Sequence, residues 1–347
     1  MDAQDTASFA DIRRLLAELP GPDRDSAAAA RQRQAALLKP PGALGRLEEL
    51  VIWLAAWQGR HPPSVARPRV AVFAGGHGIA ARGVSAYPPD VTAQMVRAFV
   101  AGGAAINQLC AVFDADLRVY EMAPDLPTAD FTEAPAMSES DCAQAMAYGM
   151  MAVEDGFDVM LLGEMGIANT TSAAALSAAL VGGDPADWVG PGTGVDAAGR
   201  ARKLETVRAG LARHAGNLAD PLEALRRLGG VELAAIAGAL LACRLARTPV
   251  LLDGFAATAA AAVAFRLDPT LLDHCRVAHV SAEPGHRRLL AALDRRPLLD
   301  LDLSLGEASG AATALPLLQA ACACHSGMAT FAEAGVAGPD GAGSSNA

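Results

Sequence analysis

The sequence predicts a doubly wound α/β fold, in which a parallel sheet is buried between two layers of helices. Short apolar runs recur along the chain and are mostly continuous rather than alternating, as strands buried on both faces require. Alanine-rich stretches of helical length separate these runs. Alternation of strands and helices is the pattern of parallel sheets, because parallel neighbours need a crossover connection.

The first part of the chain is expected to be helical. Residues Asp11–Leu19 and Ser26–Leu38 are amphipathic, and Leu44–Trp57 repeats apolar residues at helical spacing. Proline-rich breaks at Pro40-Pro41-Gly42 and His61-Pro62-Pro63 separate these helices from one another and from the rest of the chain.

From residue 69 onwards, strands and helices alternate. The expected strands are Val70–Ala74, Asp116–Glu121, Val159–Gly163, Pro249–Asp253, Arg276–Ser281 and Leu301–Leu303. The expected helices between them are Val91–Cys110, Cys142–Glu154, Thr171–Val181, Val231–Arg244 and Ala256–Phe265. Residues Gly310–Gly335 return to helix, and the Gly/Ser-rich residues 337–347 are expected to form a flexible tail.

Composition excludes several classes of protein. Of 347 residues, 52% are hydrophobic and 19% charged, which is the opposite of the balance that disorder requires. The net charge of −10 gives no electrostatic reason to bind nucleic acid or anionic membranes. Polar residues interrupt the long uncharged windows, and no export signal is visible at the N-terminus. We therefore expect a cytoplasmic protein without nucleic-acid or membrane partners.

The six cysteines are expected to be reduced thiols, because nothing indicates export. The run Cys322-Ala-Cys324-His325 is the one that suggests a metal. A zinc site normally needs a further ligand pair, and the sequence contains no CxxC or HExxH motif. We predict small residues on a helix here, and no metal site.

Six polar, glycine-bearing loops follow the predicted strands. They are Ala74–Gly78, Gly163–Thr171, Gly190–Gly194, Asp253–Phe255, Ser281–His286 and Leu305–Ala311. In doubly wound folds ligands bind at the carboxyl ends of the strands, so the six loops predict one convergent site. His77, in the first loop, is expected to be structural.

The loop Gly163–Thr171 has the clearest chemical character. Its Asn-Thr-Thr cluster at a predicted helix N-terminus suits a phosphate, although the same residues also serve as ordinary helix caps. Glu164 stands at a strand end between glycines and is a candidate for function. The sequence contains neither a GxxxxGK[ST] nor a GxSxG motif, so transfer chemistry with a carboxylate base is favoured over ATP use or serine hydrolysis.

Taken together, these loops resemble one family, the nicotinate-nucleotide–dimethylbenzimidazole phosphoribosyltransferases. The matching stretches are Lys39–Glu48, Gly163–Thr171, Ser281–His286, Leu305–Ala311 and Met328–Gly335, in the order in which the family has them. The resemblance implies transfer of the phosphoribosyl group of nicotinate mononucleotide to 5,6-dimethylbenzimidazole, with inversion at the anomeric carbon. The products would be nicotinate and α-ribazole 5′-phosphate, and no cofactor is implied.

The resemblance also implies roles for single residues. Glu307, which matches the glutamate of the family's LGE motif, would be the general base, and Glu164 would stabilise charge on the ribose or assist deprotonation. The residues implied on the nucleotide side are Gly166, Asn169, Thr170, Gly192, Lys203, Ser281 and Gly306. Those implied toward the aromatic base are Ser85, Gln94 and Met165.

The implied architecture is a Rossmann-like α/β domain, residues 66–318, with a small helical domain formed by residues 1–65 and 319–336. A homodimer is expected. The chain departs from the family pattern at Ala168 and Ala308, where glycine is common, and at Pro191, where arginine is common. Base preference and nucleotide affinity are the properties that these changes would affect.

Two alternatives remain. A nonenzymatic protein could bind the nucleotide or the benzimidazole on the same fold, but such a protein would not need the base Glu307. A nicotinamide-dependent dehydrogenase would need a GxGxxG fingerprint and an acidic residue about 20 positions later, and the sequence lacks the fingerprint.

Overall fold

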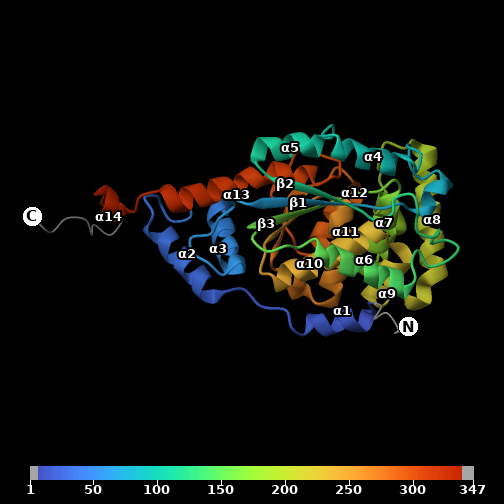
Figure 1. Ribbon diagram of the computed structural model, residues 1–347, viewed down its shortest axis with the longest axis horizontal. Coiled ribbons are helices and arrows are strands. Elements are labelled where there is room, and N and C mark those ends of the chain that lie inside the picture. Colours follow the sequence, from blue (N-terminus) through green and yellow to red (C-terminus); the bar gives the residue numbers. More distant parts are fainter. Residues whose placement is uncertain (1–6, 338–347) are drawn as a thin grey trace, which may run out of the picture.

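The computed structural model describes residues 7–337, and its centre is a five-stranded parallel sheet (Figure 1). The strands are β1 (Pro68–Ala74), β2 (Asp116–Glu121), β3 (Val159–Met165), β4 (Val250–Leu252) and β5 (Cys275–Val277). Their spatial order is β2-β1-β3-β4-β5, and every neighbouring pair is parallel. This is a doubly wound order in which the direction of winding reverses between β1 and β3, and it confirms the predicted fold class.

The expected strand Arg276–Ser281 is divided between two sheets. β5 ends at Val277, and β6 (His279–Val280) pairs instead with β7 (Leu299–Asp300) in a separate two-stranded sheet. The predicted strand Leu301–Leu303 is wrong, because β7 ends at Asp300 and the chain turns at Asp302 with φ +54°. Apolar content alone placed this strand two residues too late.

Side chains of the central strands alternate between two hydrophobic cores. Ala71 and Phe73 of β1 point into one core, while Val70 and Val72 point into the other. The first core is covered by α6 (Glu139–Met151), α7 (Asn169–Val181), α9 (Pro221–Leu228), α10 (Val231–Leu245), α11 (Phe255–Leu267) and α12 (Pro284–Ala292). The second is covered by α3 (Arg46–Gln58), α5 (Ala105–Phe113) and α13 (Ser309–Gly327). Burial on both faces explains why the strands read as continuous apolar runs.

The predicted helix Val91–Cys110 is two helices. α4 (Val91–Val100) ends before Gly102, which has φ +78°, and α5 begins at Ala105. By length and composition alone the stretch Val91–Phe113 could cross a membrane, with mean hydropathy 1.4. With 10 and 9 residues, neither helix reaches the roughly 20 residues that a membrane span needs.

Three helices were not predicted from the sequence. They are α8 (Ala197–His214), α9 and α12. Each has a recognisable start, since Asp196 and Asp220 cap α8 and α9 through their side chains and Pro284 opens α12. The short 3₁₀ segments are Gly78–Arg82, Pro185–Asp187, Ala215–Asn217 and Pro269–Leu272.

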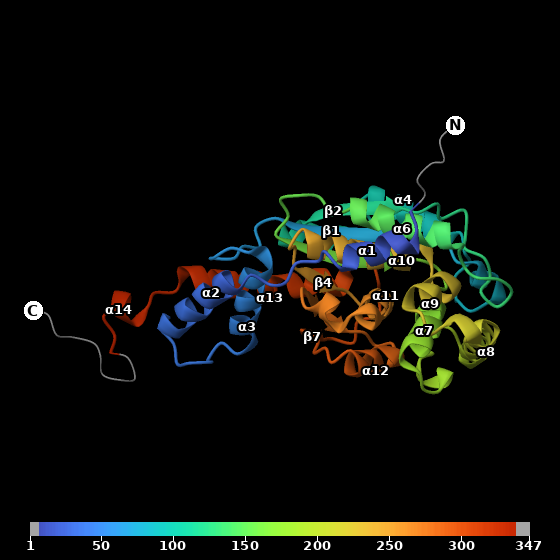
Figure 2. The ribbon, with the colours of Figure 1, turned by 90° about the horizontal axis from the view of Figure 1, so that it is seen from below.

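Helices from both chain ends lie side by side at one end of the molecule. α2 (Arg24–Ala36) and α3 pack beside the far end of α13, and α14 (Phe331–Ala334) follows (Figures 1 and 2). Arg33 donates to the carbonyl of His325 at 2.7 Å, which ties α2 to α13. The division into domains 66–318 and 1–65 with 319–336 stays a prediction, and residues 338–347 of the predicted tail lie outside the described residues.

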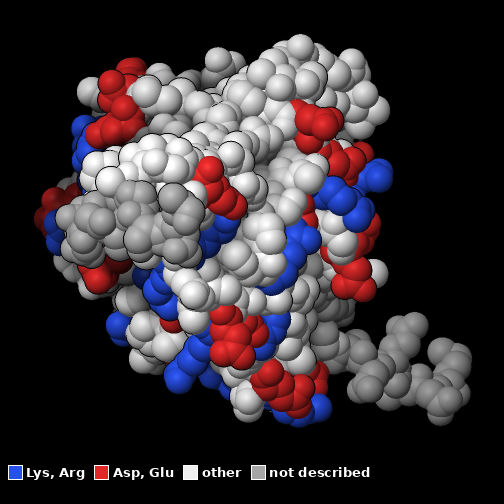
Figure 3. Space-filling view, turned by 90° about the vertical axis from the view of Figure 1, so that its left-hand side faces the viewer, with Lys and Arg blue, Asp and Glu red and all other residues white. Residues whose placement is uncertain are grey.

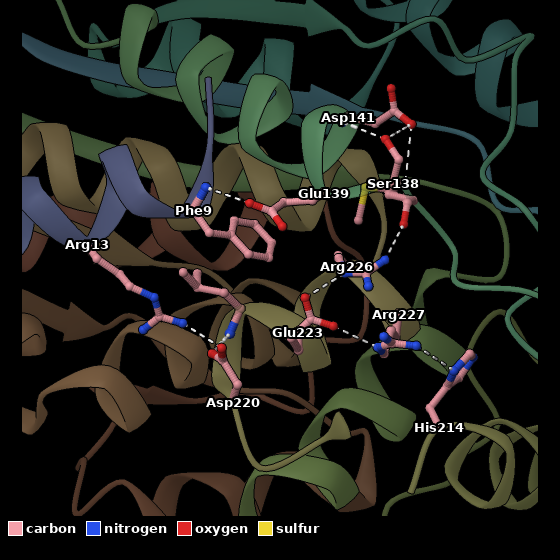
Figure 4. Close-up of polar contacts among 12 residues, drawn as sticks. Phe9, Arg13, Ser138, Glu139, Asp141, His214, Asp220, Glu223, Arg226 and Arg227 are labelled. Atoms are coloured by element: carbon pink, nitrogen blue, oxygen red, sulfur yellow. Dashed lines mark hydrogen bonds and ion pairs between the residues drawn. The ribbon is translucent and has the colours of Figure 1, made fainter. Parts of the chain in front are cut away.

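α1 (Phe9–Leu16) lies apart from this group and contacts α6 and α9 (Figure 4). Its first amide donates to Glu139 at 3.3 Å, and Arg13 pairs with Asp220. Nearby, Glu223 of α9 accepts hydrogen bonds from Arg226 and Arg227, both at 2.8 Å. The first helix is therefore fastened to the helical layer of the main sheet.

Candidate active site

A cavity of about 720 Å³ opens beyond the carboxyl end of β3, beside the point where the winding of the sheet reverses. Four loops that the sequence singled out contribute to its wall, with residues 164–167 and 169–170, 191–194, 283 and 305–307. Tyr87, Val91 and Met95 add an apolar side, and Glu283 closes another. The volume suits a small molecule of nucleotide size.

Glu164 is the penultimate residue of β3 and borders the cavity. Asn169 Nδ2 donates a hydrogen bond to its Oε2. Burial, together with the charges of Glu232 and Asp253, raises the pKa of Glu164 to about 8, although the Asn169 hydrogen bond opposes the shift. Near neutral pH the free protein therefore holds most of this carboxyl in its protonated form.

Glu307 comes from the loop before α13 and is only 3% exposed. Its backbone N–H donates to the carbonyl of Glu164 at 3.0 Å, which joins the two glutamate-bearing loops. Its Oε2 is buried and has no hydrogen-bond partner among the described residues. Burial raises the pKa of Glu307 to about 7, against a hydrogen bond from the backbone of Ile106. A carboxylate of this kind is poised to accept a proton near neutral pH.

Gly306 lets the two loops approach closely. A Cβ at this position would lie 2.6 Å from Glu164 Oε1, so only glycine leaves room for that carboxyl. Glu307 and Ala308 follow with φ +68° and +64°, a conformation that L-residues seldom adopt. The turn directs Glu307 to the cavity at a cost in backbone strain, as is frequent at functional sites.

A polar corner of the cavity wall lies at the N-terminus of α7. Lys203 is 1% exposed, and its Nζ donates to Thr170 Oγ1 at 3.0 Å. Gly192, with φ +55°, lies against both groups, and its N–H donates to Glu283 Oε1 at 2.6 Å. Burial lowers the pKa of Lys203, and Glu283 opposes the shift. An ammonium, a hydroxyl and a helix N-terminus without a side-chain cap together suit a phosphate.

Most of the predicted site residues come together here. Glu164, Met165, Gly166, Asn169, Thr170, Gly192, Gly306 and Glu307 line the cavity. Lys203 reaches it through Thr170 from behind. Ser85, Gln94 and Ser281 are not among the lining residues, and Ser85 Oγ instead lies 3.0 Å from Thr193 Oγ1. Their predicted contacts stay predictions.

Reasoning from sequence missed several residues of the wall. Tyr87, Val91 and Met95 are apolar, and nothing in their local pattern separates them from core residues. Glu283 stands in a loop that the sequence singles out, but Ser281 is the residue favoured there. Glu283 is 4% exposed, and its Oε2 has no hydrogen-bond partner among the described residues. The available signal was an acid directly before Pro284 and Gly285 at the end of a predicted strand.

The departures from the family pattern differ in their positions. Ala168 and Ala308 both have positive φ, and their methyl groups are buried in the two hydrophobic cores. Pro191 lines the cavity.

His325, which the sequence raised as a possible metal ligand, bonds other side chains: its Nδ1 lies 2.8 Å from Gln34 Nε2 and its Nε2 lies 3.0 Å from His61 Nε2. Within residues 7–337, no three His, Cys, Asp or Glu side chains are grouped to hold a metal ion.

Comparison with known proteins identifies the family of this chain. A family model described as Phosphoribosyltransferase matches residues 19–336. Nicotinate-nucleotide–dimethylbenzimidazole phosphoribosyltransferase of Rhizobium etli is 57% identical over 330 residues, covering 95% of this chain and 97% of that protein. The protein of the same name from Brucella anthropi is 54% identical over 330 residues, with the same coverage.

A solved structure is similar over most of the chain. The crystal structure of CobT from Thermus thermophilus matches with a TM-score of 0.84 and 46% identity, covering 90% of this chain and 99% of that one. The sequence resemblance is thereby confirmed. The chain belongs to the phosphoribosyltransferase family that includes the nicotinate-nucleotide–dimethylbenzimidazole phosphoribosyltransferases.

Proposed function

We propose that the protein transfers the phosphoribosyl group of nicotinate mononucleotide to 5,6-dimethylbenzimidazole, releasing nicotinate and forming α-ribazole 5′-phosphate. The observation that carries the proposal is the Glu307 carboxyl, which is buried at the cavity with an oxygen that no described residue bonds. The names of the relatives support the same reaction.

The benzimidazole needs a base because of its two ring nitrogens. One nitrogen carries a lone pair, which attacks C1′ of the ribose, and the other carries a hydrogen. Bond formation would leave a cation unless that hydrogen departs as a proton, and Glu307 accepts it. Nicotinate leaves from the opposite face as a neutral pyridine nitrogen, so the departing group needs no proton.

The polar corner holds the phosphate of the donor. Lys203 contributes a positive charge, Thr170 a hydroxyl, and α7 the N–H groups of its first turn. Glu307 lines the same cavity from another loop, and we place the ribose and the aromatic base between it and the phosphate. The apolar side formed by Tyr87, Val91 and Met95 suits the ring system.

Glu164 is assigned a second role. When Glu164 has released its proton to solvent, its carboxylate stabilises the positive charge that the ribose develops in the transition state. The free protein keeps Glu164 mostly protonated because the carboxyl is buried and because the charges of Glu232, Asp253 and Glu307 repel a further negative charge. The developing cation compensates for this repulsion.

The setting of the enzyme is also proposed. We expect a cytoplasmic homodimer whose partners are the two small substrates. On the face formed by α2, α3 and α14, basic and acidic side chains are interspersed (Figure 3). That face shows no continuous basic patch of the kind that nucleic-acid-binding proteins carry.

The test is to mix the purified protein with nicotinate mononucleotide and a panel of bases, without added metal, and to measure released nicotinate. We expect release with dimethylbenzimidazole, and the panel ranks other benzimidazoles and purines against it. Binding of both substrates without release of nicotinate would favour the alternative, a nonenzymatic binding protein.

A further inference from the structure

Next to the active-site loop 164–170, three polar side chains are hydrogen-bonded in a row. The proposed reaction assigns them no role. His77 Nε2 lies 2.6 Å from Glu232 Oε1, and His77 Nδ1 lies 3.0 Å from Ser172 Oγ. All three residues are at most 3% exposed. They come from the loop after β1, the first turn of α10 and the first turn of α7.

We propose that Ser172, His77 and Glu232 are positioning residues for the loop 164–170, and that the charge of Glu232 acts on the reaction through Glu164. This inference rests on the proposed phosphoribosyl transfer.

Contact with Gly166 supports the positioning role. A Cβ at Gly166 would lie 3.2 Å from His77 Nε2 and 3.3 Å from Glu232 Oε1. Gly166 also lines the cavity. One side of its backbone therefore contacts His77 and Glu232, while the other side forms part of the active-site wall. Movement of His77 or Glu232 therefore moves the wall.

The charge of Glu232 has no full compensation in its surroundings. Its Oε2 is buried and has no hydrogen-bond partner among the described residues, although burial of an unpaired carboxylate oxygen is costly. The carboxylate can only accept, so His77 donates to it from Nε2, and the other ring nitrogen, Nδ1, faces the Ser172 hydroxyl. A purely structural hydrogen bond would not require an acid at position 232, since a neutral amide would also form a hydrogen bond with His77.

A hydrolytic triad is excluded by the same geometry. In such a triad the serine hydroxyl meets Nε2 of the histidine, whereas Ser172 meets Nδ1. Ser172 is fully buried, so no substrate reaches its hydroxyl.

The charge of Glu232 acts on Glu164 through space. The groups that act on that carboxyl are Glu232 from α10, Asp253 after β4, Glu307 before α13 and Asn169 from α7. After burial, Glu232 contributes the largest rise in the pKa of Glu164, whereas it is not among the groups that shift the pKa of Glu307. Removing its charge should therefore lower the pKa of Glu164 alone.

The test compares the pH dependence of kcat/KM, which reports ionisations of the free enzyme, in the wild-type protein and in Glu232→Gln, which keeps the hydrogen bond to His77 and removes the charge. Activity that depends on ionised Glu164 rises with pH, and we expect this limb to move by about one unit to lower pH in the variant. In a Glu164→Gln background, the same change should leave the pH profile in place. A limb that does not move, or one that moves equally in both backgrounds, overturns the electrostatic part.

Two further variants complete the comparison. Ser172→Ala keeps the charge of Glu232 and removes the hydrogen bond between Ser172 and His77. We therefore expect kcat to fall roughly three- to tenfold at every pH, without a shift of the acid limb of the pH profile. Unchanged kcat in Ser172→Ala overturns the positioning part, and this variant decides that part even if Glu232→Gln does not fold. Glu223→Gln, which removes an ion-paired carboxylate of α9 outside the cavity, is the matched control and should keep the wild-type profile (Figure 4). If the wild-type protein releases no nicotinate with any base, the proposed function fails and not this inference alone.

Discussion

Replacement of Glu307 by glutamine should reduce catalysis and, at the same time, stabilise the protein at alkaline pH. The two side chains have nearly the same shape, so packing around the buried position changes little. The variant loses the group that accepts the proton of the benzimidazole. Removal of a general base lowers kcat by about 10²- to 10⁴-fold, and we expect at least the lower end of this range.

The effect on stability follows from the raised pKa. Glu307 has a pKa of about 7 in the folded protein and about 4.5 when unfolded. Between these values the folded state binds more protons than the unfolded state, so the free energy of unfolding falls as pH rises. The difference of about 2.5 units corresponds to about 3 kcal/mol, a contribution that is fully present below about pH 4 and is lost by about pH 8.

Glutamine cannot ionise, so Glu307→Gln should escape this loss. We expect its free energy of unfolding to exceed that of the wild type at pH 8 by up to about 3 kcal/mol, and the two proteins to converge toward about pH 4 to 5. Urea denaturation at several pH values measures this, and steady-state release of nicotinate measures kcat.

Two results would refute this reasoning. If Glu307→Gln keeps more than about a tenth of the wild-type kcat, Glu307 is not the general base. If the variant is no more stable than the wild type at pH 8, the carboxyl is not held in the environment that raises its pKa. In the wild type, the contribution of Glu307 to kcat/KM should also fall to about a tenth of its plateau at pH 6.

The remaining predictions concern the phosphate corner and the strained turn. Lys203→Met should raise the KM for nicotinate mononucleotide about 10- to 100-fold and change the KM for the base much less; equal changes would remove Lys203 from the phosphate site. Gly192→Ala would place a Cβ 2.7 Å from Lys203 Nζ and 2.8 Å from Thr170 Oγ1, so the same KM should rise, and an unchanged KM would show that the loop adapts. Ala308→Gly should change the free energy of unfolding by less than about 1 kcal/mol, because relief of the left-handed backbone is offset by loss of a buried methyl and of chain stiffness. Ala308→Val should cost more than about 2 kcal/mol in urea denaturation, and a smaller loss would argue against strain at this turn.

Local pattern was sufficient for much of the fold. Strands buried on both faces must be apolar throughout, so β1 and β3 could be located from composition and length. The pattern was insufficient where backbone geometry decides. Helix α4 stops near Gly102, and the strand after residue 276 changes sheets at Ala278, although neither break interrupts the apolar run.

The site shows the same division. Glu164 could be singled out because a lone acid between glycines at a strand end is chemically unusual, and Glu307 because it matches the glutamate of the family's LGE motif. Glu232 also stood out in principle, as one acid in a nearly uncharged helix, but only its approach to His77 gives that acid a role. The wall residues Tyr87 and Met95 carried no such signal.

The sequence was enough to predict the parallel sheet, the loops that bear the site, the family and the two glutamates. Buried strands require continuous apolar runs, and close backbone approach requires glycine, so both can be recognised from neighbouring residues, as can the family's motifs. Only the folded chain reveals which groups meet: Lys203 with Thr170, the backbone of Glu307 with that of Glu164, and Glu232 with His77. These contacts depend on the strand order and on the paths of the loops between segments that are distant in the sequence. They set the pKa values of both glutamates, since burial and nearby charge are properties of the folded surroundings and not of any local stretch of chain.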